Sequence, residues 1–160
     1  GWCCICSCTP TEKMEQTTYL RWIGDIPFDH KLDDPDFKVC DEEKAVQYFW
    51  FNEKTYRGEK GAIEDFFAQN YRPQKAKKES GLLRVRFMVN CEGQSGRFRI
   101  LGMDENYQPK EFDTSITRQL LRLTKALDQW KALRYKEQPK DYYQYLIFKL
   151  EKGIIKEILP

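Results

Sequence analysis

Hydrophobic and polar residues alternate in two pairs of segments in the second half of the chain. Every second side chain within residues 82–91 is apolar, the pattern of a strand with one buried face. Residues 97–101 resume the alternation after a turn at 92–96 that contains two glycines, which predicts a hairpin. Residues 142–150 and 154–159 predict a second strand pair, joined by a turn around a glycine.

Two other segments show the spacing of a helix. Between positions 63 and 71 apolar side chains recur at i, i+3, i+4 and i+8, and Pro73 marks the end of this helix. A longer apolar stripe runs over 112–130, with Asp113 or Thr114 as its N-cap. The order of elements predicts an α+β fold in which two helices pack on one face of a small antiparallel sheet.

This α+β domain occupies residues 61–160, and the chain before it is less regular. Residues 1–18 predict a tether, because the stretch after the cysteines is small, polar and charged. Residues 19–60 predict an extension packed on the domain. Its expected short strands lie at 19–26 and 37–40, and residues 45–51 fit either a buried strand or a buried helical segment.

Length and composition favour one folded domain. The chain has 160 residues, of which 41% are hydrophobic and 14% aromatic, too many for a disordered chain. No run of about 18 apolar residues occurs, so the sequence predicts no transmembrane helix.

Charge is distributed unevenly along the chain, although its net value is only +2. Residues 29–43 hold seven acids against two lysines, and residues 75–99 hold seven bases against two glutamates. The two segments can attract each other or steer separate partners. Four bases form an outward row on the hairpin, which we interpret as an anion-binding face, a solubilising face or a partner of the acidic segment: Arg84, Arg86, Arg97 and Arg99.

Four of the six cysteines lie within residues 3–8, without the intervening folded unit that a zinc site usually has. Ile5-Cys6-Ser7-Cys8 resembles a bacterial lipobox, and the chain does not begin with Met. The resemblance implies an exported protein with a lipid on Cys8. Two cysteines, Cys40 and Cys91, then remain, either as a disulfide or as two buried thiols.

Candidate catalytic groups are few. His30 is the only histidine and lies in the acidic segment, where a solvated side chain is expected. The acid pairs Asp33–Asp34 and Asp104–Glu105 also lie in predicted loops. We therefore expect no enzyme, no metal and no cofactor, and no nucleic-acid partner for an exported chain.

Four segments of the C-terminal half follow one another in a fixed order: Tyr71-Arg72-Pro73-Gln74-Lys75-Ala76, Val85-Arg86-Phe87-Met88-Val89, Trp130-Lys131-Ala132 and Tyr145-Leu146-Ile147-Phe148. This order of motifs resembles the C-terminal domain of TonB-family proteins. Arg72 is inserted in the first motif and Ala132 replaces a usual proline in the third, and no proline-rich spacer precedes the domain. The resemblance therefore implies the recognition module rather than energy transduction.

The family resemblance implies a non-catalytic module in the bacterial cell envelope. Its partner would be a protein or peptide, such as a segment of an outer-membrane receptor, that adds a strand to a sheet edge. The membrane would be met only through the lipid anchor. The alternatives are an edge that closes the sheet or pairs in a homodimer, and an envelope scaffold that binds an anionic ligand on the arginine row. The expected edge is Ile154, Ile155, Lys156, Glu157 and Ile158.

Overall fold

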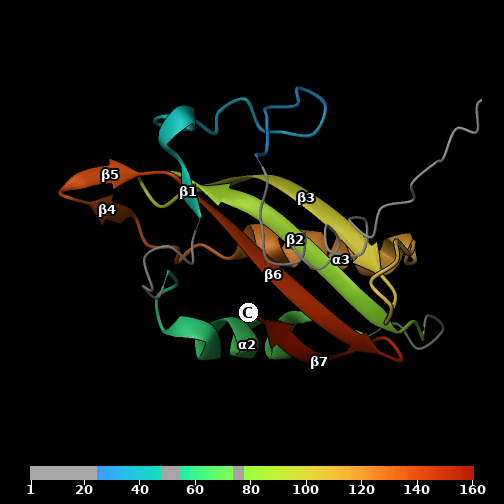
Figure 1. Ribbon diagram of the computed structural model, residues 1–160. Helices are drawn as coiled ribbons and strands as arrows, with labels where there is room; N and C mark the ends of the chain where they lie inside the picture. Colours follow the sequence, from blue (N-terminus) through green and yellow to red (C-terminus); the bar gives the residue numbers. More distant parts are fainter. Residues whose placement is uncertain (1–24, 48–54, 74–77) are drawn as a thin grey trace, which may run out of the picture.

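The computed structural model describes residues 25–47, 55–73 and 78–160 (Figure 1). A five-stranded sheet has the order β1-β6-β2-β3, and β7 pairs with the same strand β6. A separate two-stranded ribbon is formed by β4 and β5. The elements are a 3-10 turn (Glu42–Lys44), β1 (Val46–Gln47), α2 (Glu59–Asn70), β2 (Gly81–Val89), β3 (Ser95–Met103), α3 (Thr114–Ala126), β4 (Leu133–Tyr135), β5 (Gln138–Lys140), β6 (Tyr142–Glu151) and β7 (Ile154–Leu159).

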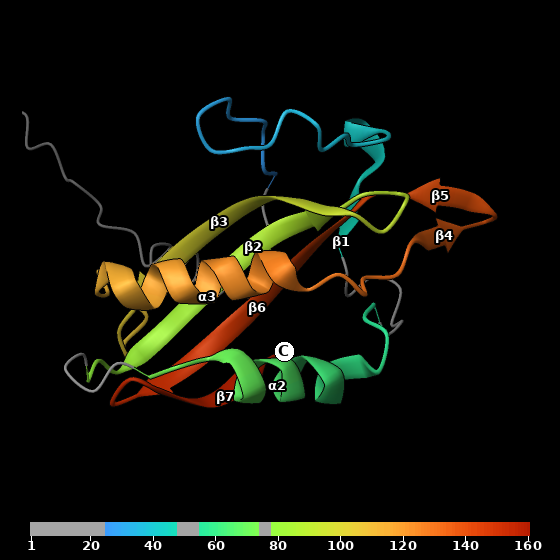
Figure 2. The same cartoon turned by 180° about the vertical axis from the view of Figure 1, so that it is seen from behind.

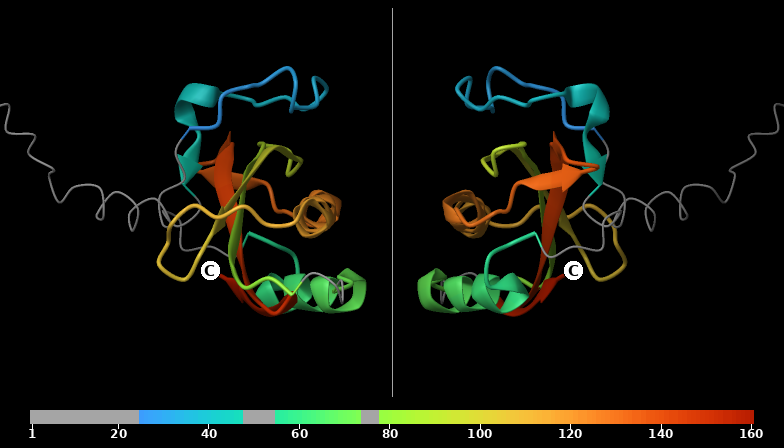
Figure 3. Two further views of the ribbon diagram at one scale, coloured as in Figure 1. Left: turned by 90° about the vertical axis from the view of Figure 1, so that its right-hand side faces the viewer. Right: turned by 90° about the vertical axis from the view of Figure 1, so that its left-hand side faces the viewer.

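Both helices pack on one face of the sheet (Figures 2 and 3). The apolar side chains predicted for this face of β2 and β6 are all buried there, among them Leu83, Phe87 and Phe148. The helices contribute Phe67 from α2 and Leu120 from α3 to the same core. The α+β prediction is thus confirmed. The sheet is not wholly antiparallel, because the short β1 runs parallel to β6.

The second helix is shorter than its apolar stripe predicts. Asp113 caps α3 by accepting a hydrogen bond from Ser115 N at 2.9 Å, and the helix ends at Ala126 because Leu127 is already extended. Trp130 still fills the core, but from an irregular segment. Its ring lies 4.8 Å from that of Tyr56, centroid to centroid, so the apolar stripe continues past the end of the helix.

Residues 25–45, which we name the strap, lie against the opposite face of the sheet. Ile26 is fully buried there against Met88, Tyr143 and Ile147. The prediction of a strand at residues 37–40 is wrong, because this stretch is irregular. Phe37 N donates to Asp34 O in a turn, and Cys40 N donates to a side chain instead of a neighbouring strand.

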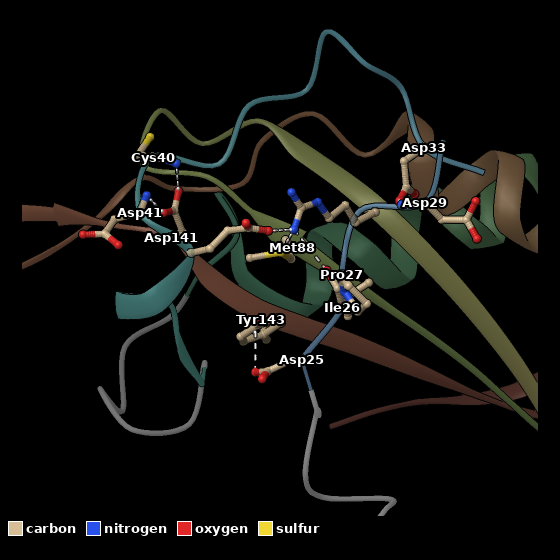
Figure 4. A network of polar contacts seen from close by, with 12 residues as sticks. Asp25, Ile26, Pro27, Asp29, Asp33, Cys40, Asp41, Met88, Asp141 and Tyr143 are labelled. Carbon is tan, nitrogen blue, oxygen red and sulfur yellow. Dashed lines mark hydrogen bonds and ion pairs between the residues drawn. The ribbon is translucent and has the colours of Figure 1, made fainter. Parts of the chain in front are cut away.

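That side chain is Asp141, which is buried at the start of β6. Its carboxylate accepts hydrogen bonds from Cys40 N at 3.0 Å and Asp41 N at 2.7 Å (Figure 4). It also accepts a hydrogen bond from Cys91 N at 3.0 Å. The structure also joins Cys40 to Cys91 by a disulfide, the first of the two alternatives left open by the sequence. A closed loop of this length stabilises a fold by about 4 kcal/mol in the chain-entropy model.

Two ion pairs fasten the rest of the strap to β3. Arg99 binds Asp33 through two hydrogen bonds of 2.7 and 2.8 Å, and it also donates to Pro27 O at 3.1 Å. Arg97 pairs with Glu42. The oppositely charged segments of the sequence are therefore drawn together within one chain. The hydrogen bonds from Arg99 hold the pKa of Asp33 below its usual range, against the effect of burial.

The β4–β5 ribbon has no counterpart in the sequence-based prediction. Its turn places Lys136 at φ 49° and Glu137 at φ 66°, where glycine and asparagine are usual. No helix in the described parts of the chain is long and apolar enough to cross a membrane. The predicted tether, most of the strand expected at 19–26 and residues 48–54 lie outside the described residues.

We predict that Asp141→Asn destabilises the protein by about 2–4 kcal/mol, because an amide faces three N–H donors with one acceptor oxygen and adds a donor of its own. Urea denaturation at neutral pH measures this change in the free energy of unfolding. Asp65→Asn removes an exposed acid on α2 and is the matched control. Equal stabilities of the two variants would contradict the role of Asp141.

The ion pair of Asp33 predicts a defined pH dependence. Since the folded state lowers the pKa of this carboxyl, its contribution is complete above the unfolded pKa near 4 and is lost as the pH falls further. Asp33→Asn should cost about 1–3 kcal/mol at pH 7 and flatten the fall in stability between about pH 4 and 2. The exposed Asp36→Asn is the control. Parallel stability curves for wild type and Asp33→Asn would refute this assignment.

Candidate functional site

A groove lies between helix α2 and strand β7, at the end of the sheet remote from the disulfide. Figure 2 shows the two elements side by side. The groove has a volume of about 560 Å³, within the range of ligand sites. Helix α2 contributes residues to one side of the groove and strand β7 to the other. The buried lining residues Phe67, Tyr71 and Ile158 form its floor. The lining residues are Lys60, Glu64, Phe67, Ala68, Tyr71, Pro73, Ile154, Ile155, Lys156, Glu157 and Ile158.

Strand β6 pairs with three other strands, and these pairings determine the position of β7. One edge of β6 pairs with β2 through nine consecutive residue pairs, from Gly81 with Leu150 to Val89 with Tyr142. Its other edge carries β1 at one end and β7 at the other. Among the described residues β7 pairs only with β6, so its second edge has no strand partner there. Five consecutive residues of β7, Ile154 to Ile158, line the groove. This is the strand that the sequence nominated as an edge.

Strand β7 carries two features that proteins use to manage sheet edges. Its register against β6 shifts between Lys149 and Leu150, which leaves Lys156 as the extra residue of a bulge. Lys156 and Glu157 are both exposed and charged. These features limit indiscriminate pairing, and they leave Ile155 and Ile158 directed to the helix side of the strand.

The floor of the groove is apolar and well anchored. Phe67 is buried with its ring centroid 4.8 Å from that of Phe148. Tyr71 donates a hydrogen bond of 2.8 Å from its hydroxyl to Gly153 O, in the turn between β6 and β7. Burial raises the pKa of Tyr71, so the phenol stays protonated and keeps this bond at neutral pH. This bond joins the end of helix α2 to the turn that precedes strand β7.

The rim of the groove on the helix side has mixed charge and one small residue. Lys60 and Glu64 form an exposed ion pair with an N–O distance of 3.8 Å. Ala68 follows one turn later on the same side of α2 and is exposed. A free strand edge beside an apolar floor can bind an extended peptide, because the edge supplies backbone hydrogen bonds and the floor accepts alternate side chains.

The arginine row does not lie open. Arg84 is buried, Arg97 and Arg99 are paired with acids of the strap, and Arg86 is half-buried opposite Arg99. An external polyanion would have to displace these partners. The arrangement matches the third interpretation of the row, contact with the chain's own acidic segment.

The other predicted chemical groups are not brought together into a site. Cys40, Cys91 and Asp141 place their ligand-type atoms within 4.8 Å of one another, but the two sulfurs are bonded to each other and offer no thiolate. His30 is exposed. The candidate lipidation site, Cys8, lies outside the described residues.

Sequence reasoning identified the strand of this groove but missed its helical wall. The signal was present at positions 60, 64 and 68, which recur every four residues beside the buried stripe of α2. The period of apolar residues shows which face of α2 packs on the core. Which strand lies beside the flank of the helix depends on the order of strands in the sheet, and the period does not give that order.

Comparisons with known proteins leave the chain without an assigned relative. No family model matches it, and no curated protein or solved structure is significantly similar to it.

Proposed function

We propose that this protein is a non-catalytic recognition module of the bacterial cell envelope that binds an extended protein segment by strand addition to β7. The observation that carries the proposal is the coincidence of an unpaired strand edge with an apolar groove. Ile155 and Ile158 of this edge line the groove together with Phe67 of α2 and Tyr71, the residue that follows α2. A strand added to β7 would gain backbone hydrogen bonds and bury alternate side chains on the floor.

Two further features support a location in the bacterial cell envelope. A disulfide between Cys40 and Cys91 suits an oxidising compartment such as the periplasm. The TonB-like order of motifs and the lipobox-like sequence at Cys8 favour an envelope protein with a lipid anchor, and they suggest an outer-membrane receptor as partner. A second copy of the chain is the competing occupant of the edge.

We predict that peptides selected on the wild-type protein from a displayed library of random nine-residue sequences lose at least about tenfold in affinity for Ala68→Trp. The indole would fill the groove from an exposed helix position. Gln69→Trp places the same side chain at the next exposed position of α2, outside the groove, and should bind as wild type does. Calorimetric titration of the selected peptide measures both affinities.

The mode of binding is tested on the peptide instead of the protein. In an added strand alternate N–H groups pair with β7, so N-methylation at one set of positions should abolish binding, and at the other set it should change affinity less than about threefold. Uniform tolerance of N-methylation would contradict strand addition, and equal affinity of both Trp variants would exclude this groove. A dimer that Ala68→Trp dissociates would identify a second copy as the occupant.

A further inference from the structure

A second hollow lies under the strap, formed by different residues from those of the α2–β7 groove. Its volume is about 440 Å³, and its walls are mainly apolar. Phe37 packs so closely on β3 that a Cβ atom at Gly96 would lie 2.3 Å from the ring, so only glycine permits this wall. The hollow contains one buried cation. Its lining residues are Phe28, Pro35, Phe37, Val39, Glu42, the buried Arg97 and the exposed Lys38.

The backbone of Arg97 is unusual. The register between β2 and β3 shifts so that Arg97 and Phe98 together face Phe87, which defines a β-bulge. Arg97 adopts φ 55°, a left-handed conformation that favours glycine. Bulges re-aim side chains, and strained residues of this kind concentrate at functional sites. The bulge directs this arginine under the strap.

The side chain of Arg97 is buried but incompletely bonded. Only 8% of the residue is exposed. Its Nη1 donates to Ile26 O at 3.1 Å and pairs with the carboxylate of Glu42, while its Nε has no hydrogen-bond partner among the described residues. The guanidinium carbon also lies 5.9 Å from the ring centre of Phe28, close enough for a cation–π contact.

The partner of Arg97 is the more movable member of the pair. The side chain of Glu42 is 58% exposed and sits in the short 3-10 turn of the strap. Its carboxylate marks where an external carboxylate would meet the guanidinium. A rotation of Glu42 into solvent would leave its acceptor position to a ligand and would leave the cation buried beside apolar walls.

We propose that this hollow binds a small monocarboxylate with an apolar body, whose carboxylate replaces Glu42 on Arg97. The aromatic walls fit a hydrocarbon or aryl group, and the volume suits a small ligand. The strap carries several further acids, among them Asp29, Asp41 and Glu43, which disfavour a dianion such as a phosphate monoester. The site is separate from the α2–β7 groove and does not depend on peptide binding there.

The test titrates 3-phenylpropionate into the full chain and follows the backbone amide signals of the strap by NMR. Glu42→Gln removes the competing carboxylate and should tighten binding about three- to tenfold, a gain limited by the exposure of Glu42. Glu43→Gln removes the same charge from the neighbouring exposed position and should change affinity less than about twofold. Arg97→Lys should weaken binding at least about tenfold, because lysine lacks the planar fork.

Two ligand controls make the outcome decisive even where Arg97→Lys disturbs the strap. The neutral 3-phenylpropionamide and the dianion phenyl phosphate should each bind at least about tenfold more weakly than 3-phenylpropionate. Equal binding of the amide would overturn recognition of a carboxylate. Tighter binding of phenyl phosphate would overturn the ligand class. Equal affinities of the Glu42→Gln and Glu43→Gln variants, or binding to neither, would overturn the exchange at Arg97.

Discussion

The pairing of β2 with β6 determines where every other strand of the sheet lies. Nine consecutive residue pairs occupy one whole edge of β6, so every other strand of the sheet must take the outer edge of β2 or the remaining edge of β6. β3 takes the first, and the short strands β1 and β7 divide the second. Side chains alternate along this ladder between the two faces of the sheet. Both helices therefore pack on one face, and the strap packs on the other.

The two faces are stabilised by different interactions. The helix face is an apolar core in which Phe67 and Phe148 are typical contacts. The strap adds its apolar residues to the other face, but it is also fixed by one disulfide, one carboxylate with three backbone donors and two ion pairs. The polar clamp at Asp141 joins the strap, the β2–β3 turn and the start of β6 at one point. Both candidate sites depend on this division, because the groove borders the helix face and the hollow lies under the strap.

Much of the sheet and both helices could be predicted because they follow simple periods. Alternation located β2, β3, β6 and β7, and Asp113 was one of the two residues named as cap of α3. The end of α3 could not be read from the stripe, since Leu127 and Trp130 stay buried after the backbone leaves the helix. The β4–β5 turn uses Lys136 and Glu137 in place of the usual turn residues, so no local signal marks it.

The candidate sites were less accessible to sequence reasoning than the strands. The edge at Ile154 to Ile158 followed from the order of elements, but its groove requires the flank of α2, which sequence periods do not place. The arginine row was correctly located on the hairpin, but Arg97 and Arg99 are covered by a strap that is irregular apart from one short 3-10 turn, so no sequence period placed it. The left-handed conformation of Arg97 has no sequence signature, because an arginine occupies a position that normally favours glycine.

We propose that the outer edge of β7 is free to receive a strand, a claim that amide hydrogen exchange of residues 154–159 can test on the unmodified protein. In the free protein the N–H groups that do not pair with β6 should exchange at rates close to those of an unprotected chain, and a bound peptide should slow them by at least about tenfold. Protection of these outward amides in the free monomer, or rates unchanged by a bound peptide, would contradict the claim.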